Sequence, residues 1–523
     1  MVRDFRGNRL LVTIIMAALV TSACQAAAPT SSQALASSGA QATPVKGGTL
    51  RIGLGTEPLS FDPANYLATT DLIITRMIFD GLVSFDASLH VIPGLATSWT
   101  QIDTTTWRFK LRQGVKFSDG SAFSAKDVKA SLERDAAKPS GSTFVGFIQQ
   151  VNIIDDFTVD VKTKNPVGPF LTDMATEVAA ITTEAQTKLP DASLLLSPIG
   201  TGPFMLKEFT KGQRTVLVPN PNYWGTAPLL DQVNFIPIPD SASRYAALKS
   251  GQVDVIEDPP TEDVQTIQQG GSGLTLDKSP ASRDLRIGFQ MQNPVMANLN
   301  LRAAIAYAID AKSIDDYVVN GLERYANNGW LPSEIFTPNP PLSIPFDLAK
   351  AKQLLTQAGY PNGLTLELDT PTGRYLGDTD IAQAVQQQLK AIGITVNIKT
   401  MQWAAYLSYV GAHSGQMFII GWANTSGDPA IAFRQNFFST SSFNFAGLND
   451  PAMDQDLTQA EQTTDQASRQ TLYQAATKIL FDQVVMKPIY WKNNLFAMNT
   501  DVKGFVATPN ELIDVTGTWI AAK

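Results

Sequence analysis

Alternating strand and helix patterns between residues 347 and 398 constrain the fold of this chain more than any other feature. Residues 347–358 have the spacing of an amphipathic helix that ends at a glycine, and residues 364–368 then alternate apolar and polar side chains as a strand does. Residues 380–392 repeat the helical spacing, and residues 394–398 repeat the strand alternation. Strand, helix and strand in this order predict an α/β fold in which helices cover a parallel or mixed sheet.

Three further segments extend this pattern. Residues 48–54 alternate as a strand, and a helix is predicted from an N-cap at Asp71 to a closing glycine at Gly81. Residues 285–289 form another predicted strand, and residues 300–314 a helix with one apolar face. Ligands of such sheets bind beyond the carboxyl ends of the strands, so the loops that leave those ends are the candidate binding segments.

The side chains in those loops are aromatic, amide or charged, which suits recognition of a polar organic molecule. The candidate ligand-binding residues are Glu57, Phe61, Gln290, Asn293, Arg374, Tyr375, Trp403, Trp422, Asn424, Thr425 and Asp428. An arginine such as Arg374 suits a bidentate contact with a carboxylate or phosphate, and the alternative is an ion pair within the protein. The two tryptophans either stack on a ligand or pack in the core.

The amino terminus has the pattern of an export signal. Basic residues precede an uncharged apolar run at residues 10–20, which is too short to span a membrane, and small residues then lead to Cys24. Residues 21–24 resemble the lipobox of bacterial lipoproteins, although Thr21 stands where leucine is usual. We therefore expect a signal peptide over residues 1–23, a lipid on Cys24 and a flexible tether over residues 24–45; an ordinary signal peptide is the alternative.

The composition argues against several classes of function. Basic side chains number 40 and acidic ones 48 in 523 residues, which argues against nucleic acid as a partner. With one cysteine and two histidines, the chain lacks the ligands of a catalytic metal, so we expect no metal site and no cofactor; nickel near His413 would have to arrive as a chelate. The absence of GxSxG and HExxH motifs makes a secreted hydrolase the weakest alternative. The acidic pairs at 155–156 and 257–258 are interpreted as solvated turns.

Ordered sequence blocks resemble one known family, the family 5 extracellular solute-binding proteins, which are the binding components of importers for peptides, nickel chelates and related solutes. The resemblance covers nearly everything from Lys46 to the end of the chain. The blocks are GTLRI at 48–52, DP at 62–63, DGL at 80–82, PGLA at 93–96, WRFKLR at 107–112, GVKF at 114–117, DG at 119–120, AKDV at 125–128, GTGPF at 200–204, NYW at 222–224, LRAAI at 301–305 and AID at 308–310.

This resemblance implies a two-lobed clamshell of the type II periplasmic-binding kind with an extra subdomain in the first lobe. Lobe one would take residues 46–282 and the returning segment 491–523, lobe two residues 283–490, and the extra subdomain about residues 85–198. The implied protein is an extracytoplasmic monomer that binds a small molecule or peptide and delivers it to ABC permease subunits in the membrane. No reaction on the solute is implied.

One departure from the family bears on the solute. In the peptide-binding members, a Gly-Trp pair is followed three residues later by an aspartate that binds the peptide amino terminus; here Gly421 and Trp422 are followed by Thr425. An ammonium group buried without a counter-charge costs several kcal/mol. We therefore expect no ordinary peptide with a free amino terminus unless Glu57 or Asp428 reaches it. Oligosaccharides, blocked peptides, opines and chelates remain alternatives, as does a sensing role.

Overall fold

The computed structural model describes residues 43–66, 69–190, 194, 197–270, 273–332, 334–335 and 342–521. The predicted signal peptide, the lipid attachment site at Cys24 and nearly all of the tether lie outside the described residues. The elements below belong to the unit that begins at Pro44. Within the described part of the chain, no helix combines the length and the apolar character that crossing a membrane requires.

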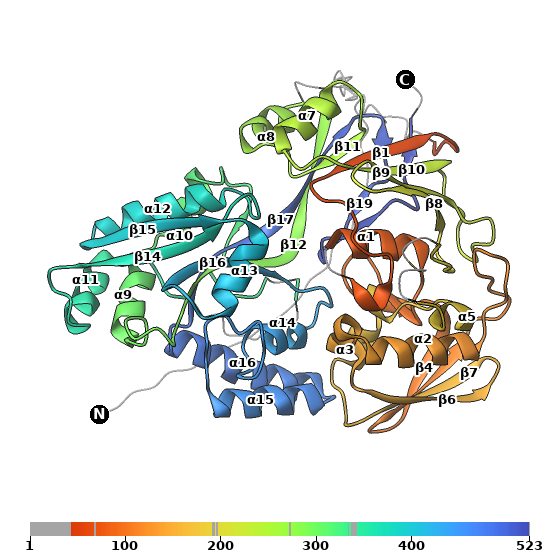
Figure 1. Cartoon of the computed structure of the whole chain (residues 1–523), viewed down its shortest axis with the longest axis horizontal. Helices are drawn as coiled ribbons and strands as arrows, with labels where there is room; N and C mark the ends of the chain where they lie inside the picture. Colours follow the sequence, from red (N-terminus) through yellow and green to blue (C-terminus); the bar gives the residue numbers. More distant parts are fainter. Residues whose placement is uncertain are drawn as a thin grey trace, which may run out of the picture. The chain divides into compact units, whose positions relative to one another are not determined.

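A large mixed sheet organises the fold (Figure 1). Its strand order is β15 (Ile394–Met401), β14 (Leu364–Pro371), β16 (Met417–Ala423), β12 (Leu274–Phe289), β17 (Met486–Asn499), β11 (Val255–Glu257), β1 (Thr49–Leu54), β10 (Gln232–Pro237), β9 (Arg214–Pro219) and β8 (Phe204–Thr210), with β13 (Arg324–Tyr325) paired to β17. Parallel pairs join β1 to β10 and β11, and β14 to β15 and β16. The sheet confirms the predicted α/β class.

The long strands β12 and β17 connect two hydrophobic cores. They pair with each other antiparallel, and β12 also pairs with β16. Leu274 at the start of β12 belongs to the core beside β11, whereas Leu285 farther along belongs to the core beneath β14 and β16. On β17, Ile489 and Ala497 divide in the same way between these two cores. Each long strand is therefore anchored at both ends in different parts of the fold.

A second, antiparallel sheet of four strands lies between β1 and β8 in the sequence. Its order is β4 (Ala96–Asp103), β5 (Thr106–Leu111), β7 (Thr158–Thr163) and β6 (Ile148–Asp155). The helix α2 (Ala125–Ala137) packs against β6 and starts with a capping box, in which Ser124 and Asp127 satisfy each other's backbone N–H groups. Nearby elements are η1 (Pro63–Asn65), α1 (Thr69–Ile78), β2 (Val83–Phe85), β3 (Val91–Pro93), α3 (Pro139–Val145), α4 (Phe170–Met174), η2 (Glu177–Ala179) and α5 (Glu184–Thr187).

Helices cover the part of the large sheet that contains β14, β15 and β16. They are α9 (Leu299–Ala308), α10 (Ala311–Tyr317), α11 (Leu348–Gln357), α12 (Asp378–Lys390), α13 (Trp403–Gly411), α14 (Pro429–Asn436), α15 (Pro451–Gln462) and α16 (Gln466–Asp482). The other part carries α7 (Ser241–Lys249) and α8 (Thr261–Gln268), with the short strands β18 (Val502–Lys503), β19 (Val506–Ala507), β20 (Ile513–Asp514) and β21 (Trp519–Ile520) near the carboxyl terminus.

The boundaries of three predicted helices are wrong. Helix α1 begins before Asp71, whose carboxylate instead accepts hydrogen bonds from the N–H groups of Leu59 and Ser60, and the helix ends at Ile78 rather than at Gly81. The predicted helix over 300–314 is two helices, because Asp310 leaves helical geometry and caps α10 by accepting from the Ser313 N–H. The residue before α12 is Gly377, not the predicted cap Asp380.

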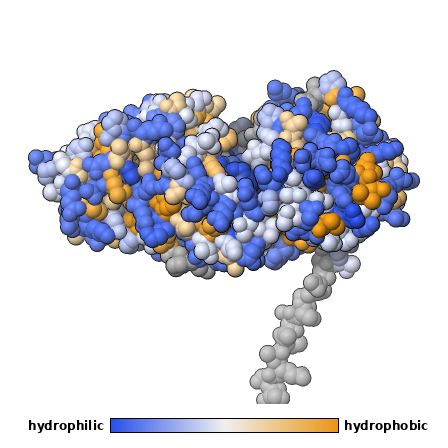
Figure 2. Space-filling model, turned by 90° about the horizontal axis from the view of Figure 1, so that it is seen from below, coloured by the Kyte–Doolittle hydropathy of each residue, from blue (hydrophilic) through white to orange (hydrophobic). Residues whose placement is uncertain are grey.

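The surface on the face seen from below is mostly hydrophilic (Figure 2). Hydrophobic side chains on that face gather only in small clusters between polar ones. Single exposed apolar residues are normal on a protein surface. This face therefore gives no reason to expect a broad apolar docking area.

Candidate functional site

Loops from the carboxyl ends of parallel strands on both parts of the large sheet form the candidate site. Asp258 directly follows β11, and the loop containing Arg374 and Tyr375 follows β14. Trp403 follows β15, and the segment that begins at Trp422 closes β16. The Tyr375 hydroxyl donates to the Gly421 carbonyl over 3.2 Å and so joins the β14 and β16 loops. This is where an α/β sheet places its ligand.

The buried carboxylate of Asp378 fixes the backbone of the loop that carries Arg374. Asp378 Oδ2 accepts hydrogen bonds from the backbone N–H groups of Arg374 at 2.8 Å and of Tyr375 at 3.2 Å. The Tyr375 ring packs edge to face on Trp403, with centroids 6.0 Å apart, and Trp403 stacks on Tyr406 at 5.8 Å. The three rings and Asp378 therefore fix the position from which the Arg374 side chain starts.

The Arg374 guanidinium is exposed and unpaired. Its carbon Cζ lies 5.0 Å from the centroid of the Trp403 ring and 5.5 Å from that of Tyr375. Among the described residues, no side chain forms a hydrogen bond or an ion pair with it. Desolvation, followed by the positive charge of Arg283, lowers the pKa of Arg374. The charges of Arg283, Glu511 and Asp258 also act on the pKa of Arg374, so these side chains lie in its surroundings.

Arg283 and Glu511, whose charges act on Arg374, form a buried ion pair. Arg283 on β12 donates from Nε and Nη2 to the two carboxylate oxygens of Glu511, each over 2.7 Å, and both side chains are about nine-tenths buried. Desolvation acts to raise the pKa of Glu511, but the charges of Arg283 and Lys492 outweigh it and lower the value to about 2. Glu511 is therefore ionised and fully engaged at neutral pH.

The loop after β16 is shaped by its own polar side chains. Asn424 is buried; its Oδ1 accepts from the N–H groups of Ser426 and Gly427, and its Nδ2 donates to the Asp428 carbonyl over 2.7 Å. Thr425 is partly exposed; its carbonyl oxygen accepts from Asn510 at 3.5 Å, and its hydroxyl forms no hydrogen bond with the residues that the structure describes. Thr425 is therefore the side chain of this loop that stays available to a solute.

Asp428 has partners of its own. Its two oxygens accept from Arg469 at 2.6 and 2.7 Å, and Oδ1 also caps α14 by accepting from the Ala430 N–H at 2.9 Å. Glu57 is engaged as well, because its Oε2 accepts from the Gly212 N–H at 2.5 Å. Neither carboxylate is thus free to replace the missing acid at Thr425.

Other predicted contact residues also serve the protein's own packing. Gln290 is fully buried and donates to the Val410 carbonyl over 3.1 Å, and Asn293 donates to the Gly415 carbonyl over 3.0 Å. Phe61 is buried against Phe209, with ring centroids 5.2 Å apart. These side chains hold loops in place and offer little polar surface to a ligand.

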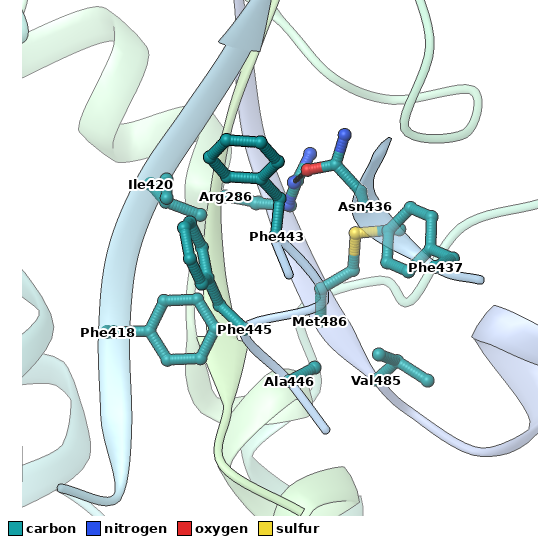
Figure 3. A pocket seen from close by; sticks show the side chains of 11 residues that line it. Arg286, Phe418, Ile420, Asn436, Phe437, Phe443, Phe445, Ala446, Val485 and Met486 are labelled. Atoms are coloured by element: carbon teal, nitrogen blue, oxygen red, sulfur yellow. Dashed lines mark hydrogen bonds between the residues drawn. The ribbon is translucent and has the colours of Figure 1, made fainter. Parts of the chain in front are cut away.

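Trp422 lies beside a small pocket rather than a solute-sized cavity. Its ring packs on Phe443 at 5.2 Å, and its Nε1 donates to Gln435 over 2.7 Å. The pocket next to Phe443 is lined by aromatic and aliphatic side chains together with Arg286 (Figure 3), and its volume of about 10 Å³ admits about one water molecule. Arg286 is already paired with Asp284, so this pocket is not the solute site.

The described residues contain no group of three or more His, Cys, Asp or Glu side chains arranged to hold a metal ion. His413 is partly buried, with Nδ1 3.3 Å from Gln290 Oε1 and 3.3 Å from the Phe445 carbonyl oxygen. A single imidazole in this position serves the packing of the loop.

Sequence reasoning missed the acidic pair after β11. Glu257 is not solvated, because its carboxylate accepts a hydrogen bond from the Gly55 N–H and so ties β11 to the β1 loop. Asp258 lies beside Lys492, with Oδ1 3.6 Å from Nζ. The same strand-end rule that found Arg374 would have found Asp258, had residues 255–257 been recognised as a strand.

Comparison of the sequence with known proteins identifies one matching family and several similar proteins. Residues 90–444 match the family described as bacterial extracellular solute-binding proteins, family 5 middle. The chain is 28% identical over 476 residues to the glutathione-binding protein GsiB of Pectobacterium atrosepticum, covering 88% of this chain and 92% of that one. It is 28% identical over 487 residues to the dipeptide-binding protein of Escherichia coli, covering 86% and 91%.

A solved structure extends the likeness to the fold. The ABC transporter-associated periplasmic binding protein DppA from Helicobacter pylori, in complex with the peptide STSA, aligns with a TM-score of 0.79 at 27% identity. The alignment covers 91% of this chain and 99% of that one. Its architecture is that of a two-lobed periplasmic binding protein, which confirms the predicted fold.

Proposed function

Because the chain belongs to the family 5 bacterial extracellular solute-binding proteins, we propose that it captures a peptide-like solute outside the cytoplasm and delivers it to the permease of an ABC importer. The family is made up of solute-binding proteins, and the proposal assigns no reaction to this chain. Relatives named for glutathione and dipeptides support a short peptide-like solute.

The unpaired guanidinium of Arg374 is the observation that carries the choice of solute. A guanidinium binds a carboxylate through two parallel hydrogen bonds, and such charge-assisted bonds are strongest where water is partly excluded. The rings of Tyr375 and Trp403 lie next to the Arg374 guanidinium, and the side chain remains exposed. A solute with a free carboxylate satisfies this group, whereas a neutral oligosaccharide leaves it without a counter-charge.

We propose that the solute is enclosed between the two predicted lobes, residues 46–282 with 491–523 and residues 283–490. The two hydrophobic cores joined by β12 and β17 support this division. Arg374 and Tyr375 belong to the second lobe, and Asp258 and Glu511 to the first. A solute that touches both sets stabilises the closed form by its differential contacts there.

The neutral side chain of Thr425 supports a solute that does not place a free ammonium against the loop after β16. Asp428 and Glu57 are engaged by Arg469 and by the Gly212 N–H, so neither supplies the missing charge. The solute therefore has its amino group blocked, absent or placed elsewhere. A peptide with an unusual linkage meets this condition.

We also propose that the protein is a monomer tethered to the outer face of the cytoplasmic membrane by a lipid on Cys24. The apolar run at residues 10–20 and the uncharged segment that follows Cys24 support this arrangement. Mass spectrometry of the mature protein tests it, because a lipidated Cys24 adds the mass of the acyl chains to the amino-terminal peptide.

Native mass spectrometry of the purified mature protein tests the function. Comparison of the masses before and after denaturation identifies a co-purified solute, which we expect to be a short peptide-like molecule with a free carboxylate. Calorimetric titration should then show Kd raised about 10- to 100-fold by Arg374→Gln, the loss expected for one bidentate charged contact. The control Arg214→Gln removes an exposed arginine on β9 and should leave Kd unchanged. A solute without an anionic group, or an unchanged Kd for Arg374→Gln, contradicts the proposal.

A further inference from the structure

Helix α14 is shared by the two predicted lobes. It begins directly after the loop that contains Trp422 and Thr425, and its Phe433 packs in a core of the second lobe. Ile431 on the same helix is 1% exposed and belongs instead to the core that contains β1 and the four-stranded sheet. A candidate solute loop and a contact between the lobes therefore follow each other in the chain.

Arg434, near the end of α14, bonds to residues of both predicted lobes. Glu461 on α15, in the same lobe, accepts from Nε over 2.8 Å and so orients the guanidinium. Nη1 donates to the Thr143 carbonyl over 2.9 Å, and Nη2 donates to Asp173 Oδ2 over 3.4 Å. Thr143 and Asp173 belong to the predicted extra subdomain of the first lobe. One guanidinium thus connects α14 and α15 to that subdomain.

The Asp173 carboxylate depends on this contact. Its side chain is fully buried, and within the part of the chain that the structure describes its Oδ1 has no hydrogen-bond partner. The cation of its ion pair, Arg434, belongs to the other lobe. Because a buried carboxylate without a counter-charge is costly, the arrangement in which the lobes meet over Asp173 requires Arg434.

The two lobes also approach each other closely at Gly168. Its N–H donates to the Glu461 carbonyl over 2.6 Å, and a Cβ atom at position 168 would lie 2.2 Å from the Thr463 carbonyl oxygen. The φ of Gly168 is not positive, so its own backbone conformation accepts other residues. Glycine is therefore required here by the neighbouring lobe rather than by its own loop.

We propose that these contacts form a latch that holds the two lobes closed around the solute. The latch consists of Arg434, Glu461, Thr143, Asp173 and Gly168. This inference rests on the proposed function, because it assigns these residues to the closure of the solute site. Without the latch, contacts of the solute alone must stabilise the closed form, and the solute then dissociates faster.

Hydrogen exchange at the Gly168 amide reports on the latch, because this N–H is bonded across the two lobes. The neighbouring Pro166 and Pro169 have no N–H, so mass spectrometry of a short peptide follows few other amides. Desolvation raises the pKa of Asp173 to about 7, against the charge of Arg434, and exchange at about pH 8 keeps its carboxylate ionised. In Arg434→Gln this amide should exchange about 10-fold or more faster, the effect of losing hydrogen bonds to a charged group.

Gly168→Ala tests the same latch without removing a charge. Its methyl group meets the Thr463 carbonyl oxygen when the lobes close, so the amide of residue 168 should exchange about 5-fold or more faster. Arg214→Gln on β9 removes an exposed arginine and should leave this amide unchanged. The amides of Val159 and Val161 in β7, inside the four-stranded sheet, should keep their protection in all three variants.

The outcomes separate the latch from the proposed function. Faster exchange at residue 168 with unchanged β7 amides, and a smaller fraction of protein that carries co-purified solute in native mass spectrometry, supports the latch. Unchanged exchange at residue 168 in both variants overturns it and leaves the proposed solute intact. Faster exchange in β7 as well shows a general loss of stability and also overturns it, as does an undiminished solute fraction. A co-purified solute without an anionic group contradicts the proposed function and leaves the exchange result valid.

Discussion

Removing Arg469 should destabilise the loop that follows β16 through the carboxylate of Asp428. Both side chains are more than nine-tenths buried, and two hydrogen bonds of 2.6 and 2.7 Å join them. Arg469 also donates from Nε to the Ala460 carbonyl over 3.1 Å. Breaking a buried ion pair by removing one partner costs about 3–5 kcal/mol, because the remaining charge stays buried without its counter-charge.

The variant Arg469→Met keeps most of the side-chain volume and removes the charge. At about 2.1 cal/mol/K per residue, a unit of this length has an unfolding entropy of about 1 kcal/mol/K, so each kcal/mol lowers the Tm by about 1 °C and differential scanning calorimetry should show a decrease of about 3–5 °C. The matched control Arg214→Met breaks the exposed pair with Glu208, and about 0–1 kcal/mol is expected there. A decrease for Arg469→Met no larger than that of the control refutes the reasoning.

A second substitution identifies the cause of the loss. Asp428→Ser in the Arg469→Met background removes the orphaned charge and keeps an oxygen that caps α14 at the Ala430 N–H. The double variant should therefore be more stable than Arg469→Met alone. If the two losses add instead, the charge left behind is not the main cost.

Two further predictions concern single side chains. Desolvation, followed by the charge of Glu367, raises the pKa of Asp369 to about 7. The protonated carboxyl group of Asp369 therefore stabilises the folded protein at low pH, and this stabilisation is lost as pH rises through about 7. Because loss of this stabilisation lowers Tm between pH 5 and 8, Asp369→Asn should make the decrease in Tm over that range smaller. The same dependence of Tm on pH in the variant and the parent protein contradicts the raised pKa of Asp369. Thr425→Asp should create affinity for Ala-Ala but not for N-acetyl-Ala-Ala in calorimetric titration, and equal affinities would show that position 425 does not meet the amino terminus.

The fold was predictable because its signals are local and repeated. The alternation at residues 364–368 and 394–398 and the helix between them correspond to β14, α12 and β15 in the structure. Boundaries were less predictable, since they depend on contacts that the local pattern does not contain. The break at Asp310 is an example, because its N–H donates to the distant Gln388 side chain.

The candidate site was predictable only in part, because the strand-end rule locates loops without saying which side chains the loops need for themselves. Arg374 and Tyr375 lie next to each other in the candidate site, whereas Asn424 bonds within its own loop and Gln290 is buried and bonds to the Val410 carbonyl. Asp258 was missed because β11 before it has only three residues, too few for an alternation that identifies a strand.

The charged side chains of the candidate site differ in whether the protein itself supplies their partners, and this difference indicates which charge a solute can bind. Glu57, Asp428 and Glu511 all accept hydrogen bonds from the protein itself, and both oxygens of Asp428 and of Glu511 are engaged by an arginine. Asp258 forms an ion pair with Lys492, whereas no side chain within the described part of the chain forms a hydrogen bond or an ion pair with the Arg374 guanidinium. A solute that supplies a carboxylate to Arg374 replaces the contacts of its guanidinium with water by charged hydrogen bonds, which are stronger where water is partly excluded. The loop after β16, with Thr425 in place of an acid, offers the solute neutral contacts, and this arrangement favours a solute whose free charge is a carboxylate.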